Sequence, residues 1–148
     1  SGRLPAEELA AFLGRFEADA HDVVARHGAR VVKLIGDEVM FVATDAASAC
    51  AAALGLVEAF SSGFEGVVPR GGLAYGNVLL RGGDYYGTVV NLASRLVDLA
   101  VPMEVLVTEP VADAAPACRF VPAGRRVVMG LDQGIRNTVK FFQDGAKR

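Results

Sequence analysis

A lysine and an aspartate lie where two apolar runs meet, and this pair is the first candidate for chemistry. Residues 31–35 and 39–42 are rich in β-branched and bulky side chains and flank Gly36-Asp37, which predicts a tight β-hairpin. Lys33 and Asp37 would then lie close together at the hairpin tip. Because charging a buried site costs free energy without a partner, the two side chains are candidates for binding a ligand or a metal ion. A plain turn aspartate and a lysine that reaches solvent explain them equally well.

A second group of polar residues surrounds the glycine-rich stretch 82–87. Asp84 lies in this stretch, which we expect to form a flexible loop with two tyrosines. The apolar stripe that follows predicts a helix over 88–99, on which Asn91 and Arg95 lie four residues apart on a common face. Taken singly, a turn acid, a solvent-facing amide and a surface arginine paired with Asp98 are adequate explanations.

The elements that must position these side chains alternate between helix and strand. Apolar residues at helical spacing predict a long helix over 5–27, and Thr44-Asp45 is typical of an N-cap for a second helix that ends near Phe60. Residues 70–80 predict a strand or a bent strand pair, with glycines where the backbone bends or something approaches closely. The remaining expected elements are a strand at 104–108, a short helix at 109–115, and edge strands at 120–128 and 138–142.

This order favours an α+β fold, close to a ferredoxin-like βαββαβ core with extra C-terminal strands. The first strand of that core, which lies in the interior of the sheet, is missing from the sequence. We therefore expect that a strand upstream in the parent protein, or a segment of another chain, fills this place. Residues 1–148 are interpreted as a single domain, and neither a repeat nor a linker divides them.

The composition narrows the classes of partner. The net charge of −2 gives no general attraction for nucleic acid, and no apolar window is long enough to span a membrane. The hydrophobic share of 52% is high, so the surplus apolar surface is expected to cover a partner. Cys50 and Cys118 are interpreted as reduced core thiols, and His21 and His27 as surface or cap residues, which is typical of a cytoplasmic protein without a zinc site.

Three segments together resemble the catalytic domain of the class III nucleotidyl cyclases, and specifically the bacterial homodimeric adenylyl cyclases. They are Lys33-Leu-Ile-Gly-Asp37, Gly72-Leu-Ala-Tyr-Gly-Asn-Val78, and the run from Gly83-Asp84 through Asn91 to Arg95. The last segment is the most specific, because an acid, an amide and an arginine all have the separations of that family. The resemblance extends from the N-terminal helix to about Thr108 and weakens beyond it.

The resemblance implies a role for each candidate residue. Asp37 is similar to one of two aspartates that hold a pair of Mg²⁺ or Mn²⁺ ions at each site. Lys33 and Asp84 are similar to the pair that recognises adenine, in which the ammonium donates to N1 and the carboxylate accepts from the exocyclic amine. Asn91 resembles the residue that orients the ribose, and Arg95 the one that meets charge developing on the α-phosphate.

The implied reaction converts ATP to 3′,5′-cyclic AMP and pyrophosphate by in-line attack of the ribose 3′-hydroxyl, assisted by two metal ions. Because family members share each site between two subunits, the presence of all five residues in one chain implies a symmetric homodimer. Tyr85 and Tyr86 are assigned to the dimer contact, with a place beside adenine as the alternative.

Two departures from the family pattern leave alternatives open. The first metal aspartate is absent, so the sequence is expected to begin partway through the catalytic domain. The C-terminal lysine that contacts the terminal phosphates in many relatives is replaced at Val128-Met129-Gly130, and Arg125, Arg126 or Arg136 would have to serve. A catalytically inactive cyclase homology domain that dimerises or senses nucleotide is the principal alternative, ahead of a guanylyl or diguanylate cyclase.

Overall fold

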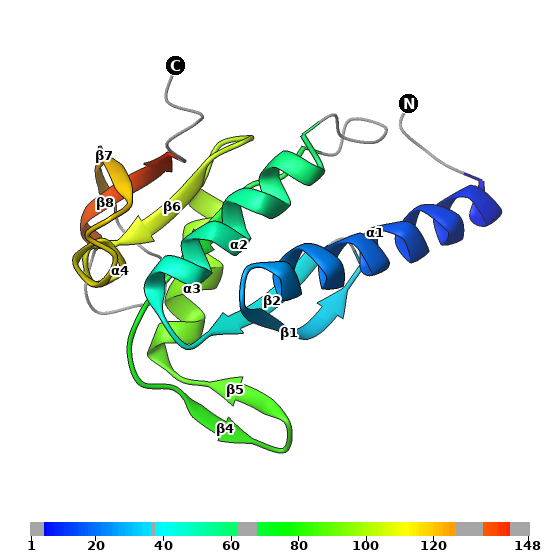
Figure 1. Ribbon diagram of the computed structural model, residues 1–148, viewed down its shortest axis with the longest axis horizontal. Helices are drawn as coiled ribbons and strands as arrows, with labels where there is room; N and C mark the ends of the chain where they lie inside the picture. The colour runs from blue at the N-terminus through cyan, green and yellow to red at the C-terminus, as the bar shows by residue number, and fades with distance from the viewer. Residues whose placement is uncertain (1–4, 37, 62–67, 127–134, 143–148) are drawn as a thin grey trace.

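A long helix and a β-hairpin begin the chain. The computed structural model describes residues 5–36, 38–61, 68–126 and 135–142, with the backbone alone at 122, 124–126 and 135–142 (Figure 1). Helix α1 spans Ala6–Arg26, and strands β1 (Ala29–Ile35) and β2 (Glu38–Ala43) pair antiparallel. Gly36, at φ +58°, provides the positive φ that a two-residue hairpin turn needs. The helix and the hairpin expected from the sequence are confirmed.

Helix α2 (Ala46–Ala59) begins at the predicted N-cap. The Asp45 carboxylate accepts hydrogen bonds from the Ser48 backbone N–H at 2.8 Å and from the Ser48 hydroxyl at 3.0 Å. These bonds satisfy a donor that the first helical turn leaves without an intrahelical partner. Helix α2 packs against α1 and against the hairpin, so these elements form one side of the molecule.

A second sheet, in the order β3-β6-β8-β7, forms the other side. Strand β3 (Gly71–Leu73) runs parallel to β6 (Val105–Thr108), and β8 (Ile135–Phe142) pairs antiparallel with both β6 and β7 (Arg119–Arg126). Strand β8 thus lies inside this sheet, and the prediction that it is an edge strand is wrong. The strand signal at 138–142 gave no information about its neighbours, because pairing is set by the whole fold.

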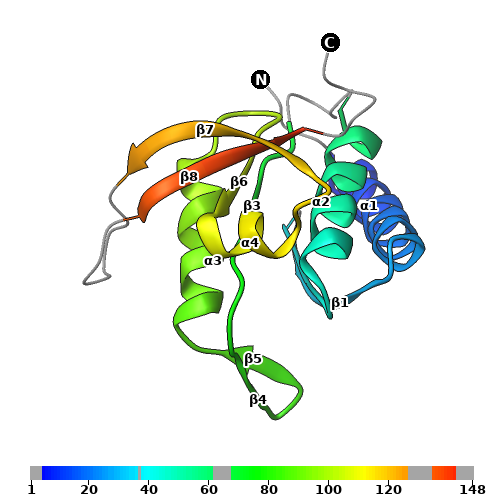
Figure 2. The same ribbon diagram turned by 60° about the vertical axis from the view of Figure 1, so that its left-hand side comes forward.

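Strand β6 is buried on both faces. Val105 and Val107 join the cluster formed by α2 and α4 (Glu109–Ala114), whereas Leu106 packs with Leu96 of helix α3 (Thr88–Leu99). The alternation of side chains along a strand therefore places one helical layer on each face of β6 (Figure 2). This double burial fixes α3, which carries two of the candidate residues.

The β1–β2 hairpin and the β3-β6-β8-β7 sheet are separate sheets, and no strand among the described residues joins them. Residues 79–86 form a third unit, the hairpin of β4 (Leu79–Arg81) and β5 (Asp84–Tyr86), which projects from the rest of the molecule in Figures 1 and 2. The stretch 70–80 therefore contributes two strands to two different sheets. Both ends of this stretch are extended, as predicted for a bent strand pair, but the two strands lie in different sheets.

Candidate active site

An irregularity in β1 directs two basic side chains to the same side of the hairpin. Val31 pairs with Phe41 and Lys33 with Met40, so Val32 is an extra residue in the ladder, a β-bulge. In a regular strand, Arg30 and Lys33 would point to opposite faces, because successive side chains alternate. With the bulge, both side chains are exposed and both reach strand β5.

Strand β5 is the element that the sequence prediction missed. The stretch 82–87 was expected to be a flexible loop, but Gly82 and Gly83, at φ +59° and +82°, form a two-residue turn and Arg81 pairs with Asp84. Positive φ at both central positions is the requirement of the hairpin turn that matches strand twist. The sequence did carry this signal, since Gly-Gly separates the apolar Leu79-Leu80 from Tyr85-Tyr86.

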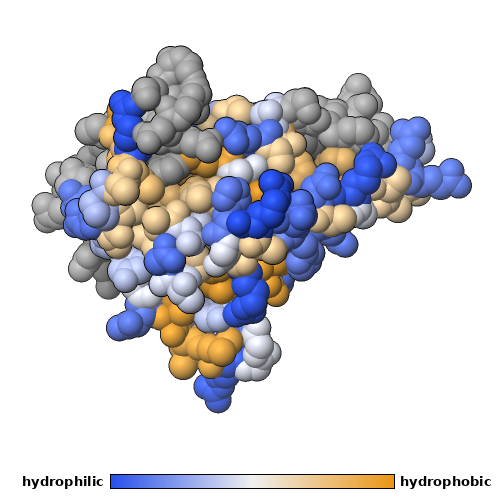
Figure 3. Space-filling model, in the orientation of Figure 1, coloured by the Kyte–Doolittle hydropathy of each residue, from blue (hydrophilic) through white to orange (hydrophobic). Residues whose placement is uncertain are grey.

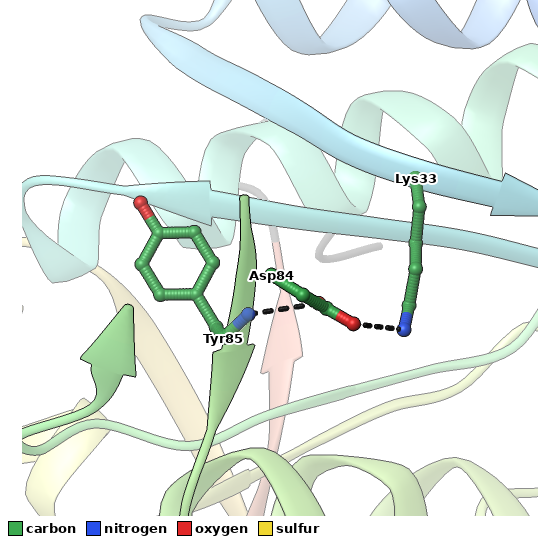
Figure 4. A network of polar contacts seen from close by, with 3 residues as sticks. All are labelled: Lys33, Asp84 and Tyr85. Atoms are coloured by element: carbon green, nitrogen blue, oxygen red, sulfur yellow. Dashed lines mark hydrogen bonds and ion pairs between the residues drawn. The ribbon is translucent and has the colours of Figure 1, made fainter. Parts of the chain in front are cut away.

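Lys33 and Asp84 meet between the two hairpins. The Lys33 Nζ lies 2.8 Å from the Asp84 Oδ2, and the two side chains point toward each other from β1 and β5 (Figure 4). The other carboxylate oxygen, Oδ1, accepts a hydrogen bond from the backbone N–H of Tyr85 at 2.8 Å. The side chains are 43% and 27% exposed, so a ligand can approach them from solvent.

This contact stabilises the charged form of each group. The hydrogen bond to Asp84 raises the pKa of the Lys33 ammonium, against a smaller effect of desolvation. The hydrogen bonds from Lys33 and from the Tyr85 backbone lower the pKa of the Asp84 carboxyl. At neutral pH the site therefore presents one cationic donor directly beside one anionic acceptor.

Arg30 makes a second link between the same strands. Its Nη2 donates a hydrogen bond of 2.7 Å to the Tyr85 hydroxyl, and its guanidinium carbon lies 5.9 Å from the centre of the Tyr85 ring. Among the described residues, this bond and the Lys33–Asp84 pair are the side-chain hydrogen bonds between β1 and β5. Sequence reasoning did not find Arg30, because strand alternation assigns it to the face opposite Lys33.

Helix α3 carries Asn91 and Arg95, and close packing on β3 sets its position. A Cβ atom on Gly72 would lie 2.6 Å from both the Ala93 carbonyl oxygen and the Leu96 Cβ, so only glycine permits this approach. Asn91 and Arg95 are exposed, and their side chains form no hydrogen bond or ion pair with any residue that the structure describes. The alternative explanation of Arg95 as a partner of Asp98 is not seen within those residues.

The candidate metal ligand Asp37 lies outside the described residues. The structure describes the hairpin up to Gly36 and again from Glu38 onward. Within the described ranges, no three His, Cys, Asp or Glu side chains come together as a metal site would require. The structure thus brings Lys33 and Asp84 together and leaves Asn91 and Arg95 available on α3.

Comparisons with known proteins identify relatives of this chain. A scan against protein-family models found no match. The chain is 42% identical over 121 residues to a Streptomyces coelicolor protein named adenylate cyclase, an alignment that covers 82% of this chain and 32% of that protein. It is 48% identical over 105 residues to a Streptomyces griseus protein of the same name, covering 71% of this chain and 26% of that protein.

A solved structure has the same fold. The adenylyl cyclase CyaB from P. aeruginosa superposes with a TM-score of 0.71 at 18% identity, covering 95% of this chain and 85% of that one. The chain belongs to the class III nucleotidyl cyclase catalytic domains. The cyclase fold expected from the sequence is confirmed. Among the described residues, its strands form three separate sheets.

This cyclase domain spans 32% and 26% of the two named relatives, so most of their length has no counterpart in it. The helices of the domain, as far as the structure describes them, include none with the length and apolar character needed to cross a bilayer.

Proposed function

We propose that this cyclase domain converts ATP to 3′,5′-cyclic AMP and pyrophosphate. The relatives named adenylate cyclase support the reaction, and the observation that carries the choice of ATP is the contact of 2.8 Å between Lys33 Nζ and Asp84 Oδ2. The pair binds adenine when Lys33 lies opposite N1 and Asp84 opposite the amine at position 6. We treat residues 1–148 as one catalytic unit.

The Lys33–Asp84 pair matches the edge of adenine. Adenine presents an acceptor at N1 and an amine donor at position 6, next to each other. An ammonium has three N–H donors and a carboxylate has free lone pairs, so each group can bind the base while the contact between them persists. The partial exposure of both side chains leaves room for this approach.

Asn91 and Arg95 are the proposed catalytic residues. The amide of Asn91 orients the ribose, and the guanidinium of Arg95 binds the α-phosphate as negative charge develops on it. The 3′-oxygen forms a bond to the α-phosphorus, the bond to pyrophosphate breaks, and the hydroxyl proton passes to solvent. Asn91 and Arg95 are exposed on α3 and have no side-chain partner among the described residues, so both side chains are available to bind a ligand.

Asp37 would contribute a carboxylate to the proposed pair of Mg²⁺ or Mn²⁺ ions. A carboxylate is the ligand type that these ions prefer, but one such group is not a complete site. When bound, the ions lower the pKa of the ribose hydroxyl and neutralise charge on the phosphates.

A symmetric homodimer completes the proposal. The projecting β4–β5 hairpin exposes Leu79, Leu80 and Tyr86 by 58%, 57% and 51%. Figure 3 shows orange, hydrophobic surface at the lower end of the molecule, where this hairpin projects. Exposed apolar groups gathered on one element are typical of a protein contact surface. In the proposed dimer, the Lys33–Asp84 pair of one subunit and Asp37 of its twin serve the same site.

The test is cyclisation by the parent protein with MnATP or MnGTP. We expect cyclic AMP from ATP and little product from GTP. Lys33→Ala and Asp84→Ala should each reduce the preference for ATP, with Arg26→Ala as a control on the exposed end of α1. Absence of turnover with both nucleotides would favour the inactive homology domain, and an unchanged preference in both variants would refute the assignment of the base-binding pair.

A further inference from the structure

We propose that Arg30 and Tyr85 form a positioning pair that determines which purine the site accepts. This inference rests on the proposed function, and it assigns a role to two side chains that do not themselves contact the base. Arg30 holds strand β5 in a fixed place against β1 through the Tyr85 hydroxyl, and so fixes which of Lys33 and Asp84 faces each position of the purine ring.

The need for such a device follows from the chemistry of the two bases. Adenine presents an acceptor at N1 and a donor at position 6, whereas guanine presents a donor at N1 and an acceptor at position 6. One ammonium beside one carboxylate is therefore complementary to either base, in opposite orders. Lys33 and Asp84 discriminate between ATP and GTP only if each stays opposite its own ring position.

The Lys33–Asp84 contact cannot hold that order without help. Both groups are partly exposed, and an ion pair of this kind fixes its members weakly because water competes for them. A lysine is also a flexible four-carbon chain whose ammonium rotates freely. The base itself competes for the same donors and acceptors when it binds.

Arg30 and Tyr85 are better suited to hold the strands. The guanidinium is planar and always charged, and it makes two kinds of contact with one aromatic side chain, a hydrogen bond of 2.7 Å and a ring contact at 5.9 Å. The Tyr85 backbone N–H donates to Asp84 Oδ1, so fixing Tyr85 also fixes the carboxylate. Neither the hydrogen bond nor the ring contact between Arg30 and Tyr85 uses an atom of Lys33 or Asp84, which bind the base.

The β-bulge makes this arrangement possible. Because Val32 is an extra residue, Arg30 and Lys33 lie on the same face of β1 and reach neighbouring residues of β5. Bulges commonly redirect side chains beside active sites. Here the bulge places a second exposed contact between β1 and β5 next to the one that binds the base.

The experiment measures purine discrimination without turnover. The Kd values for ATP and GTP are determined for the wild-type protein and for Arg30→Gln, Tyr85→Phe and the double variant. We expect the ratio of the two Kd values to fall about tenfold in Arg30→Gln and less in Tyr85→Phe, which keeps the ring contact. The double variant should be no worse than Arg30→Gln, since both changes remove one interaction.

A second measurement follows the strand itself. Hydrogen exchange of the amides of residues 84–86 should be faster in Arg30→Gln than in the wild type, and Arg30→Lys should restore part of both effects. The control is Arg26→Gln, a matched change at an arginine whose partner is Asp22 on the same helix. A Kd ratio equal to that of the control, or unchanged exchange in β5, would overturn the inference, whereas failure to form cyclic AMP would overturn only the proposed reaction.

Discussion

The packing of α3 on β3 allows a sharp test of how the fold positions the candidate catalytic residues. The change is Gly72→Ala, which adds a single methyl group. That methyl would lie 2.6 Å from the Ala93 carbonyl oxygen, 2.6 Å from the Leu96 Cβ and 2.8 Å from the Val97 backbone nitrogen. Two of these atoms belong to the helix backbone, and Leu96 is fully buried, so no side chain can turn aside to relieve the contact.

Helix α3 must therefore move away from β3 by several tenths of an ångström or more. Overpacking of this kind costs about 1–3 kcal/mol, and contact with backbone atoms favours the upper part of that range. For a domain of this size we expect Tm to fall by roughly 4–12 °C. The same displacement moves Asn91 and Arg95, so kcat should fall more than the affinity for ATP.

Thermal unfolding and steady-state kinetics of the Gly72→Ala protein measure both effects. Gly14→Ala is a matched control, because a Cβ at this exposed position of α1 would contact nothing within 4 Å. Replacing a glycine inside a helix by alanine should leave stability unchanged or raise it by up to about 1 kcal/mol. Equal Tm values for the two variants would refute the argument that close approach of α3 requires glycine at position 72.

Three further predictions concern single side chains. Arg95→Ala should lower kcat about a hundredfold or more without a measurable change in Tm, because the side chain is exposed and has no partner among the described residues. The lowered pKa of Asp84 means that its carboxylate contributes stability above its ordinary pKa of 3.8 and loses it as pH falls, so Asp84→Asn should flatten the acid limb of a stability–pH profile. Burial raises the pKa of Cys50 to about 12, so in a Cys118→Ser protein Ellman's reagent should label this thiol only upon unfolding.

The sequence predicted those elements whose signals are local. The helix over 88–99 agrees with α3, the Asp45 cap is seen at α2, and the hairpin turn falls at Gly36. Periodicity, capping and turn chemistry each depend on residues close together in the chain. The proximity of Lys33 and Asp84, 51 residues apart, was implied only by the family resemblance, and the contact between their side chains agrees with it.

Features that depend on pairing between distant segments could not be predicted from local sequence signals. Regular strand alternation would place Arg30 and Lys33 on opposite faces, and nothing in residues 29–35 marks Val32 as the extra residue of a bulge. The pairing partners of β8 were equally hidden, and so was the contact of Arg30 with Tyr85. The role of Asp37 stays a prediction, since that residue lies outside the described ranges.

The bulge at Val32 also has a consequence for how this strand can vary in evolution. Because Val32 has no partner in the ladder, its removal would leave Val31–Phe41 and Lys33–Met40 as successive pairs and would keep Arg30 and Lys33 on one face, two residues apart. Val32 itself can be exchanged for another β-branched residue with little effect. A strand one residue shorter at this place could therefore present the same two basic side chains on one face, and either length is compatible with contact to β5.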